Sequence, residues 1–196
     1  MLGAVRHGLV HIFDPRGRDA RQTFWYYVLF VVLLRVAGSM VVSIPLTVNM
    51  MRAGFEAAQR NDGEAVVQAQ MMQQMTGMMQ TMAGVGIVIG VVTMVLLAAS
   101  LARRLHDSGL SGWLVLVPGL SYAAALAMLP AQMDRVIALM PQMQAPGSGA
   151  TNPMAMMQAQ GPIALLGWVP ALFVVIFGVL KSTDGPNRYG SEPTRF

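Results

Sequence analysis

Long apolar stretches alternate with polar segments along this chain, and the apolar stretches are long enough to cross a membrane as helices. We expect spans at 24–48, 82–102, 113–129 and 163–180. The first, 25 residues long, would measure roughly 37 Å as a helix, against about 30 Å for the hydrocarbon core of a bilayer. The pattern predicts an all-α polytopic membrane protein, with a four-helix transmembrane domain at 24–180 between an N-terminal segment, 1–23, and a tail, 181–196.

Two features inside the spans bear on how the helices pack. Arg35 lies roughly 16 Å into the first span, where a charge costs about 2.5–3.5 kcal/mol. Either it snorkels or meets a carbonyl group within the bundle, or it is a functional intramembrane cation. In the second span, Gly86 and Gly90 form a small-xxx-small pattern that favours close helix contact. Outside the spans, in the N-terminal segment, we expect a short interfacial helix around 9–13.

Two Met-rich segments, 49–81 and 130–162, separate the spans and hold 13 of the 18 methionines. We expect a polar loop that becomes helical from about Glu64, and a second loop that its prolines keep largely irregular apart from a short helix at 132–140. Thioethers suit Cu(I), so these loops can be read as a soft-metal site. A Met stripe at helical spacing is more typical of packing or partner contact, which is the interpretation we favour. The candidate metal ligands are Met71, Met75, Met78, Met154, Met156 and Met157.

Composition and charge narrow the protein class. Charged residues make up only 11% of the chain and there is no cysteine, which excludes disulfides and a thiol nucleophile. Lys and Arg number nine in 1–23, 103–112 and 181–196, against three in the two Met-rich segments. Because Lys- and Arg-rich short loops stay cytoplasmic, we expect both ends of the chain in the cytoplasm and Met-rich extracytoplasmic loops. The scattered basic residues favour anionic lipid over nucleic acid as a partner.

Three polar segments would then meet at the cytoplasmic face: 17–25, 103–113 and 183–190. Arginine suits phosphate recognition, so one hypothesis is an anion or lipid head-group site. The plainer interpretation, which we favour, is that these residues orient the helix hairpin, satisfy helix ends and contact lipid phosphates. A catalytic pair of His106 and Asp107 is the third interpretation. The candidate residues of this polar cluster are Arg18, Arg21, Arg103, Arg104, His106, Asp107, Asn187, Arg188 and Tyr189.

The same segments carry a family resemblance. The stretch Arg103-Arg104-Leu105-His106-Asp107, with its following Ser-Gly-Trp, and the tail motif Gly-Pro-Asn-Arg-Tyr-Gly at 185–190 resemble the YhaH-like family of small bacterial inner-membrane proteins, over roughly Phe13 to Gly190. The resemblance implies a fold and a location in the bacterial inner (plasma) membrane. The family is one of unknown function, so it implies no reaction.

The sequence shows no Walker loop, dinucleotide fingerprint or nucleophile elbow, so we expect no enzymatic activity and no cofactor. The leading hypothesis is an accessory, interaction or anionic-lipid-associated membrane component. Its partners would be the bilayer, anionic phospholipid, and a second copy or another membrane protein. The alternative is a transport or binding component for a small solute or Cu(I).

Overall fold

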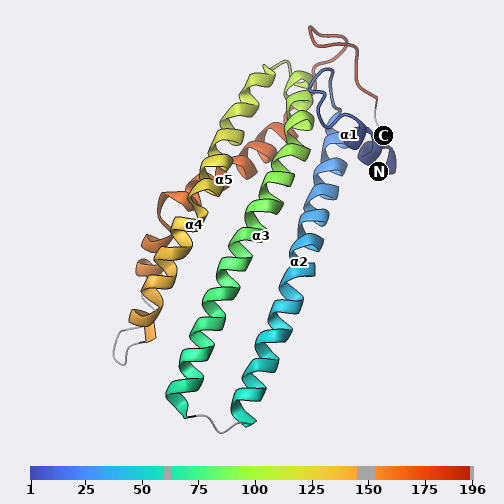
Figure 1. Cartoon of the computed structure of the whole chain (residues 1–196). Coiled ribbons are helices and arrows are strands. Elements are labelled where there is room, and N and C mark those ends of the chain that lie inside the picture. Colours follow the sequence, from blue (N-terminus) through green and yellow to red (C-terminus); the bar gives the residue numbers. More distant parts are fainter. Residues whose placement is uncertain (60–62, 145–152, 195–196) are drawn as a thin grey trace. The chain divides into compact units, whose positions relative to one another are not determined.

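The described residues of the computed structural model, 1–59, 63–144 and 153–194, form helices and no strand. Figure 1 shows the helices in chain order. Their bounds are α1 (Leu2–Val10), α2 (Arg21–Gln59), α3 (Glu64–Asp107), the 3₁₀ turn η1 (Gly112–Val115), α4 (Leu116–Gln144) and α5 (Pro153–Val179).

Three of these helical segments are long and apolar enough to cross a membrane: Arg21–Ala57, Val66–Asp107 and Gly112–Ala138. They contain the first three predicted spans. The fourth predicted span falls on α5, whose described apolar part, Leu165–Val179, is shorter. Many large apolar side chains are exposed, Val41 at 72% and Leu172 at 57% among them. In water such exposure would be unfavourable, whereas in a bilayer these side chains would meet lipid.

The helices extend well beyond the predicted spans. The prediction of a polar loop from 49 to about Glu64 is wrong for its first part, because α2 continues to Gln59; α3 then begins at Glu64, the predicted start. The prediction that 130–162 is largely irregular is wrong, because α4 continues to Gln144 and α5 begins at Pro153. Met, Gln, Ala and Leu all favour a helix, and proline at the first helical position loses no hydrogen bond. The short N-terminal helix covers Leu2–Val10 rather than 9–13.

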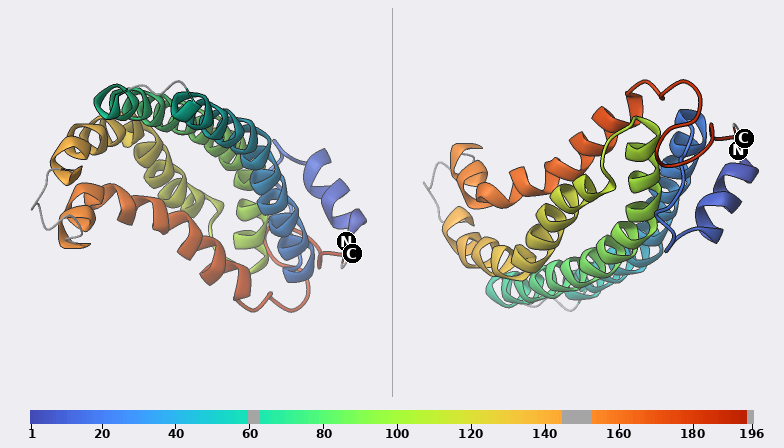
Figure 2. Two further views of the ribbon diagram at one scale, coloured as in Figure 1. Left: turned by 90° about the horizontal axis from the view of Figure 1, so that it is seen from below. Right: turned by 90° about the horizontal axis from the view of Figure 1, so that it is seen from above.

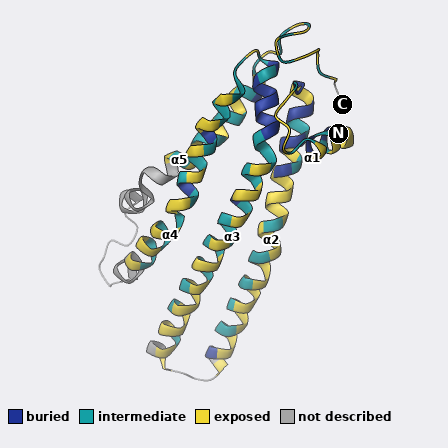
Figure 3. Ribbon diagram, turned by 45° about the horizontal axis from the view of Figure 1, so that its top comes forward, coloured by how far each residue is buried: buried dark blue, intermediate teal, exposed yellow. Residues whose placement is uncertain are grey.

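The chain divides into two compact units, and the first comprises Met1–Arg35, Gly90–Ala127 and the residues from Pro162 onward. Its buried side chains gather around the end of α3 and the start of α2, shown in dark blue in Figure 3. Phe24, Val28 and Leu101 form the apolar core there. Figure 2 shows α1 lying beside α2 and close to the tail. Gly8 permits this contact, because a Cβ at that position would overlap the buried Tyr27 ring.

The second unit comprises Val36–Ile89 and Met128–Gly161. Here the later part of α2 packs beside the first part of α3 through glycines. A Cβ at Gly38 would lie 3.6 Å from Ile89, and one at Gly54 would lie 3.9 Å from Met71. These ordinary van der Waals separations show that the two helices lie side by side at both glycines.

Candidate functional site: a buried arginine–aspartate clamp

Five charged residues meet in the first unit, and we call them the clamp: Arg18, Asp19, Arg103, Arg104 and Asp107. The last three occupy the final turns of α3, and the first two immediately precede α2. Gly17, with φ of +89°, makes the turn that brings Arg18 into place. All five are between 0 and 7% exposed, and Arg103 and Arg104 are the largest fully buried side chains of the described residues.

Asp107 organises one half of the clamp. Its Oδ1 accepts hydrogen bonds from Nε and Nη2 of Arg18 at 3.1 and 3.0 Å. Its Oδ2 accepts from Nη1 of Arg104, three residues earlier on α3. One carboxylate therefore bonds two guanidinium groups, one from its own helix and one from 89 residues earlier in the chain.

Asp19 organises the other half. Its Oδ1 accepts from Arg103 Nε at 3.0 Å and lies 3.1 Å from His7 Nε2, while its Oδ2 accepts from Ser100 at 3.1 Å. Burial raises the pKa of the Asp19 carboxyl, but the His7 hydrogen bond and the charge and hydrogen bond of Arg103 outweigh burial and hold the pKa below its ordinary value. Asp19 is thus held as an anion by its partners.

The tail supplies backbone carbonyl groups to the same arginines. Arg18 donates to the carbonyl oxygens of Gly185 at 2.7 Å and Thr183 at 2.8 Å, and Arg104 donates to that of Leu180. Thr183 returns two hydrogen bonds to the Asp107 carbonyl, from its N–H and its hydroxyl, each at 2.9 Å. The clamp therefore ties the tail to the end of α3 as well as to the start of α2.

The tail motif has its own role in this arrangement. Asn187 donates from Nδ2 to the His106 carbonyl at 3.0 Å and accepts at Oδ1 from the Tyr189 N–H at 2.9 Å. Asn187 and Gly190 exchange backbone hydrogen bonds, and Gly190 has φ of +141°, which favours glycine. The Gly-Pro-Asn-Arg-Tyr-Gly sequence is thus a turn that fits against the end of α3.

His106 faces away from the clamp. Its Nδ1 lies 3.2 Å from the Gly17 carbonyl oxygen, which can only accept, so Nδ1 carries the hydrogen. Its ring stacks on Tyr189 with centroids 3.9 Å apart, and a Cβ at Gly112 would lie 2.5 Å from its Nε2. His106 and Asp107 therefore bind different partners, and the described structure shows no bond between their side chains.

The structure brings together most of the residues of the predicted polar cluster, but divides them into two groups. Arg18, Arg103 and Arg104 point inward to protein partners, whereas Arg21 and Arg188 are exposed. Arg21 donates to the Leu180 carbonyl at 3.2 Å, and Arg188 lies over the Tyr189 ring, 4.7 Å from its centroid. Sequence reasoning did not single out Asp19. Its position between Arg18 and Arg21, next to a helix start, was the available signal.

Arg35 has a partner in the same unit. Its Nη1 donates to the Tyr122 hydroxyl at 2.8 Å, which joins α2 to α4. A Cβ at Gly90 would lie 3.1 Å from that hydroxyl and 2.8 Å from Leu126, so α4 approaches α3 closely at Gly90.

The candidate metal ligands lie on two helices. Met71 and Met75 on α3 are exposed and Met78 is half-buried. Met154, Met156 and Met157 fall in α5, but their side chains lie outside the described part of the structure. Among the described residues, no group of three or more His, Asp or Glu side chains could hold a metal ion. The Met-based site stays a prediction.

The comparison with known families covers nearly the whole chain. The family described as "Protein of unknown function (DUF805)" matches residues 12–191, which include every residue of the clamp and the tail turn. The chain belongs to the DUF805 family. This confirms the YhaH-like resemblance, which is consistent with DUF805. No curated protein matches the chain, and neither does any solved structure.

Proposed function

We propose that this DUF805 chain is a four-span protein of the bacterial inner membrane with both ends in the cytoplasm. We further propose that it is a non-enzymatic accessory component that associates with anionic phospholipid. The observation that carries the proposal is the clamp itself. It joins the N-terminal segment, the α3–α4 connection and the tail at the end of a bundle of apolar helices.

Charge supports the orientation. Three of the nine basic residues on the proposed cytoplasmic side are buried in the clamp, so only the remaining six can act on the membrane surface. Six still exceeds the three of the Met-rich segments, and basic segments are retained in the cytoplasm. The six are Arg6, Arg16, Arg21, Lys181, Arg188 and Arg195.

The bonding of the clamp supports a structural role. Both carboxylates accept hydrogen bonds from arginines, and Arg18 donates to a carboxylate and two carbonyl groups at once. A buried arginine held by this many fixed acceptors has little freedom to bind a substrate. The exposed cations around the clamp are therefore the ones free to meet anionic head groups, each contributing about 1 kcal/mol near such a surface.

The orientation can be tested by cysteine labelling, because the chain has no native cysteine. Ser191 in the tail and Gln68 on α3 are both exposed. In intact spheroplasts, a membrane-impermeant maleimide should label the Gln68→Cys variant and should label the Ser191→Cys variant only after the membrane is opened. Labelling of the Ser191→Cys variant in intact cells would refute the proposed topology.

The lipid association can be tested by mass spectrometry of phospholipid that co-purifies in mild detergent. A variant with Arg21→Gln and Arg188→Gln should retain less anionic lipid than the unaltered chain. The matched control changes two exposed arginines of the other side, Arg52→Gln and Arg135→Gln, and should retain as much as the unaltered chain. Equal retention by both variants would argue against head-group binding at the clamp end.

A further inference from the structure

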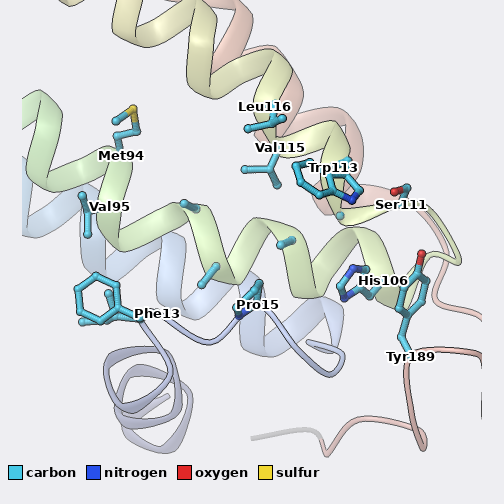
Figure 4. Close-up of a pocket in the computed structure, with 15 residues that line it drawn as sticks. Phe13, Pro15, Met94, Val95, His106, Ser111, Trp113, Val115, Leu116 and Tyr189 are labelled. Atoms are coloured by element: carbon cyan, nitrogen blue, oxygen red, sulfur yellow. The ribbon is translucent and has the colours of Figure 1, made fainter.

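An open, largely apolar cavity of about 860 Å³ lies beside the last turns of α3 in the first unit. Figure 4 shows its lining residues. The N-terminal segment contributes Phe13, α3 contributes Met94 and Ala98, and η1 contributes Trp113. The Phe13 and Trp113 side chains are 86% and 79% exposed, so the cavity has apolar rims that nothing in the described structure covers.

The length of the cavity matches one leaflet of a bilayer. Its lining follows α3 from Met94 to His106, twelve residues further on. At the helical rise this is roughly 18 Å, and half of a hydrocarbon core is about 15 Å. The apolar wall is therefore as long as the acyl chain of a lipid in that leaflet.

Polar groups gather at the His106 end of the cavity. His106, Ser111 and Tyr189 line it there, and the apolar residues Phe13, Met94 and Val95 lie toward the other end in Figure 4. The hydrogen on His106 Nδ1 leaves Nε2 as an acceptor in the neutral ring. Arg188 is not itself a lining residue, but it is exposed and lies over the ring of the lining residue Tyr189, 4.7 Å from the ring centroid, so a cation adjoins the polar end.

We propose that this cavity binds a glycerophospholipid, with one acyl chain along α3 and an anionic, phosphate-bearing head group at Arg188. The proposal rests on the membrane insertion and lipid association proposed above, and it names the site. The cavity is apolar over the length of one leaflet and has hydrogen-bond donors, an acceptor and a cation at one end. It therefore fits a molecule with an apolar tail and a charged phosphate. The clamp arginines do not take part, because all three are at most 7% exposed and each hydrogen-bonds to protein acceptors, while the two guanidinium nitrogens without a described partner, Arg103 Nη2 and Arg104 Nε, are themselves buried.

Fluorescence quenching can test the proposal, because Trp113 lines the cavity. The full chain would be placed in vesicles of phosphatidylglycerol and phosphatidylethanolamine, one of which carries brominated acyl chains that quench nearby tryptophan. Subtracting the signal of the Trp113→Phe variant isolates Trp113 from Trp25 and Trp168. The dependence of quenching on vesicle composition gives the preference of the site for one lipid over the other.

The first comparison fills the cavity. The Ala98→Phe variant should lose quenching of Trp113, and Val95→Phe, at an exposed position of the same wall, gives a second variant in case the first does not fold. Ala123→Phe adds the same bulk to an exposed position of α4 that is not part of the cavity lining, and should leave quenching unchanged. Quenching that persists in both cavity variants would mean that Trp113 meets only annular lipid, and would overturn the proposal.

The second comparison tests the head group. The Arg188→Gln variant should lower the preference for phosphatidylglycerol about fivefold, the effect expected for one cation at an anionic surface. Arg52→Gln, at an exposed cation of the first Met-rich segment, should leave it unchanged. An unchanged preference in Arg188→Gln, or an equal loss in both variants, would overturn the head-group assignment. A chain that fails to enter the vesicles would refute the proposed function as well, whereas normal insertion with unaltered quenching would refute the cavity alone.

Discussion

Replacing Asp107 by asparagine removes the charge at the centre of one half of the clamp while keeping the size of the side chain. The carboxylate is fully buried and accepts from Arg18 and Arg104, which are themselves buried. An asparagine has one oxygen to accept with, and its NH₂ group would face the donors of a guanidinium. Removing one partner of a buried ion pair costs about 3–5 kcal/mol, because the remaining charge is left buried without compensation.

We therefore expect Asp107→Asn to lower the free energy of unfolding by about 3–5 kcal/mol. The assay is an SDS titration of the full chain in mixed detergent micelles, in which tryptophan fluorescence monitors unfolding at each SDS concentration. Asp184→Asn is the matched control, since its ion pair with Lys181 has side chains that are 78% and 87% exposed. Exposed pairs contribute about 0–1 kcal/mol, so this control should unfold almost as the unaltered chain does.

The comparison of the two variants decides the outcome. A loss in Asp107→Asn no larger than that in Asp184→Asn would refute the reasoning, because it would mean that water or lipid head groups reach the clamp arginines and compensate them. A large loss confined to Asp107→Asn would support a dry clamp.

Three further predictions follow from other contacts. The pKa of Asp19 is lower in the folded chain than its ordinary value of 3.8. The stability that Asp19 contributes is therefore present above that value and is lost as pH falls through the folded pKa. We expect the stability of Asp19→Asn to depend less on pH than that of the unaltered chain below about pH 4. Gly8→Ala should release α1 from the Tyr27 ring, seen as faster proteolysis of α1, because overpacking costs about 1–3 kcal/mol. Tyr122→Phe should lower stability by about 1.5–3 kcal/mol through the lost hydrogen bond from Arg35.

Each of these has a control. An unchanged pH dependence in Asp19→Asn would show that another group carries the acid effect. Gly3→Ala, at an exposed position of α1, should not speed proteolysis, and equal proteolysis in both glycine variants would point to the helix itself rather than to Tyr27. Tyr26→Phe is the control for Tyr122→Phe, because it removes only an exposed 3.4 Å hydrogen bond from Gln22. A loss of stability in Tyr26→Phe equal to that in Tyr122→Phe would contradict the role of Arg35.

The sequence predicted the helical class and the meeting of three polar segments because both follow from strong local patterns. Apolar stretches of this length form helices in lipid, and the short connection between Asp107 and Gly112 places α3 and α4 side by side. The prediction of an irregular second loop is wrong because Pro130 and Pro141 do not end α4, which continues to Gln144. Surrounding residues with strong helix propensity carry α4 past both.

The direction in which each arginine points could not be predicted, because the decisive partners are carbonyl groups. Arg18 is buried by the Gly185 and Thr183 carbonyl oxygens, whose positions depend on how the tail folds back. Arg188, of the same residue type in the same tail, stays exposed. Residue type and spacing give the members of such a cluster, and the tertiary fold decides which of them face protein and which face the surroundings.

The central claim is that a buried arginine–aspartate clamp fixes the tail to the end of α3, and amide hydrogen exchange of the chain in phospholipid nanodiscs tests it most directly. The Thr183 backbone N–H donates to the Asp107 carbonyl. The backbone N–H of Asn187 donates to the Gly190 carbonyl, and the N–H of Gly190 donates to the Asn187 carbonyl. We predict slow exchange of these three amides in the unaltered chain and in Asp184→Asn, and fast exchange in Asp107→Asn. Exchange of the tail at the rate of an unstructured peptide in the unaltered chain would contradict the account.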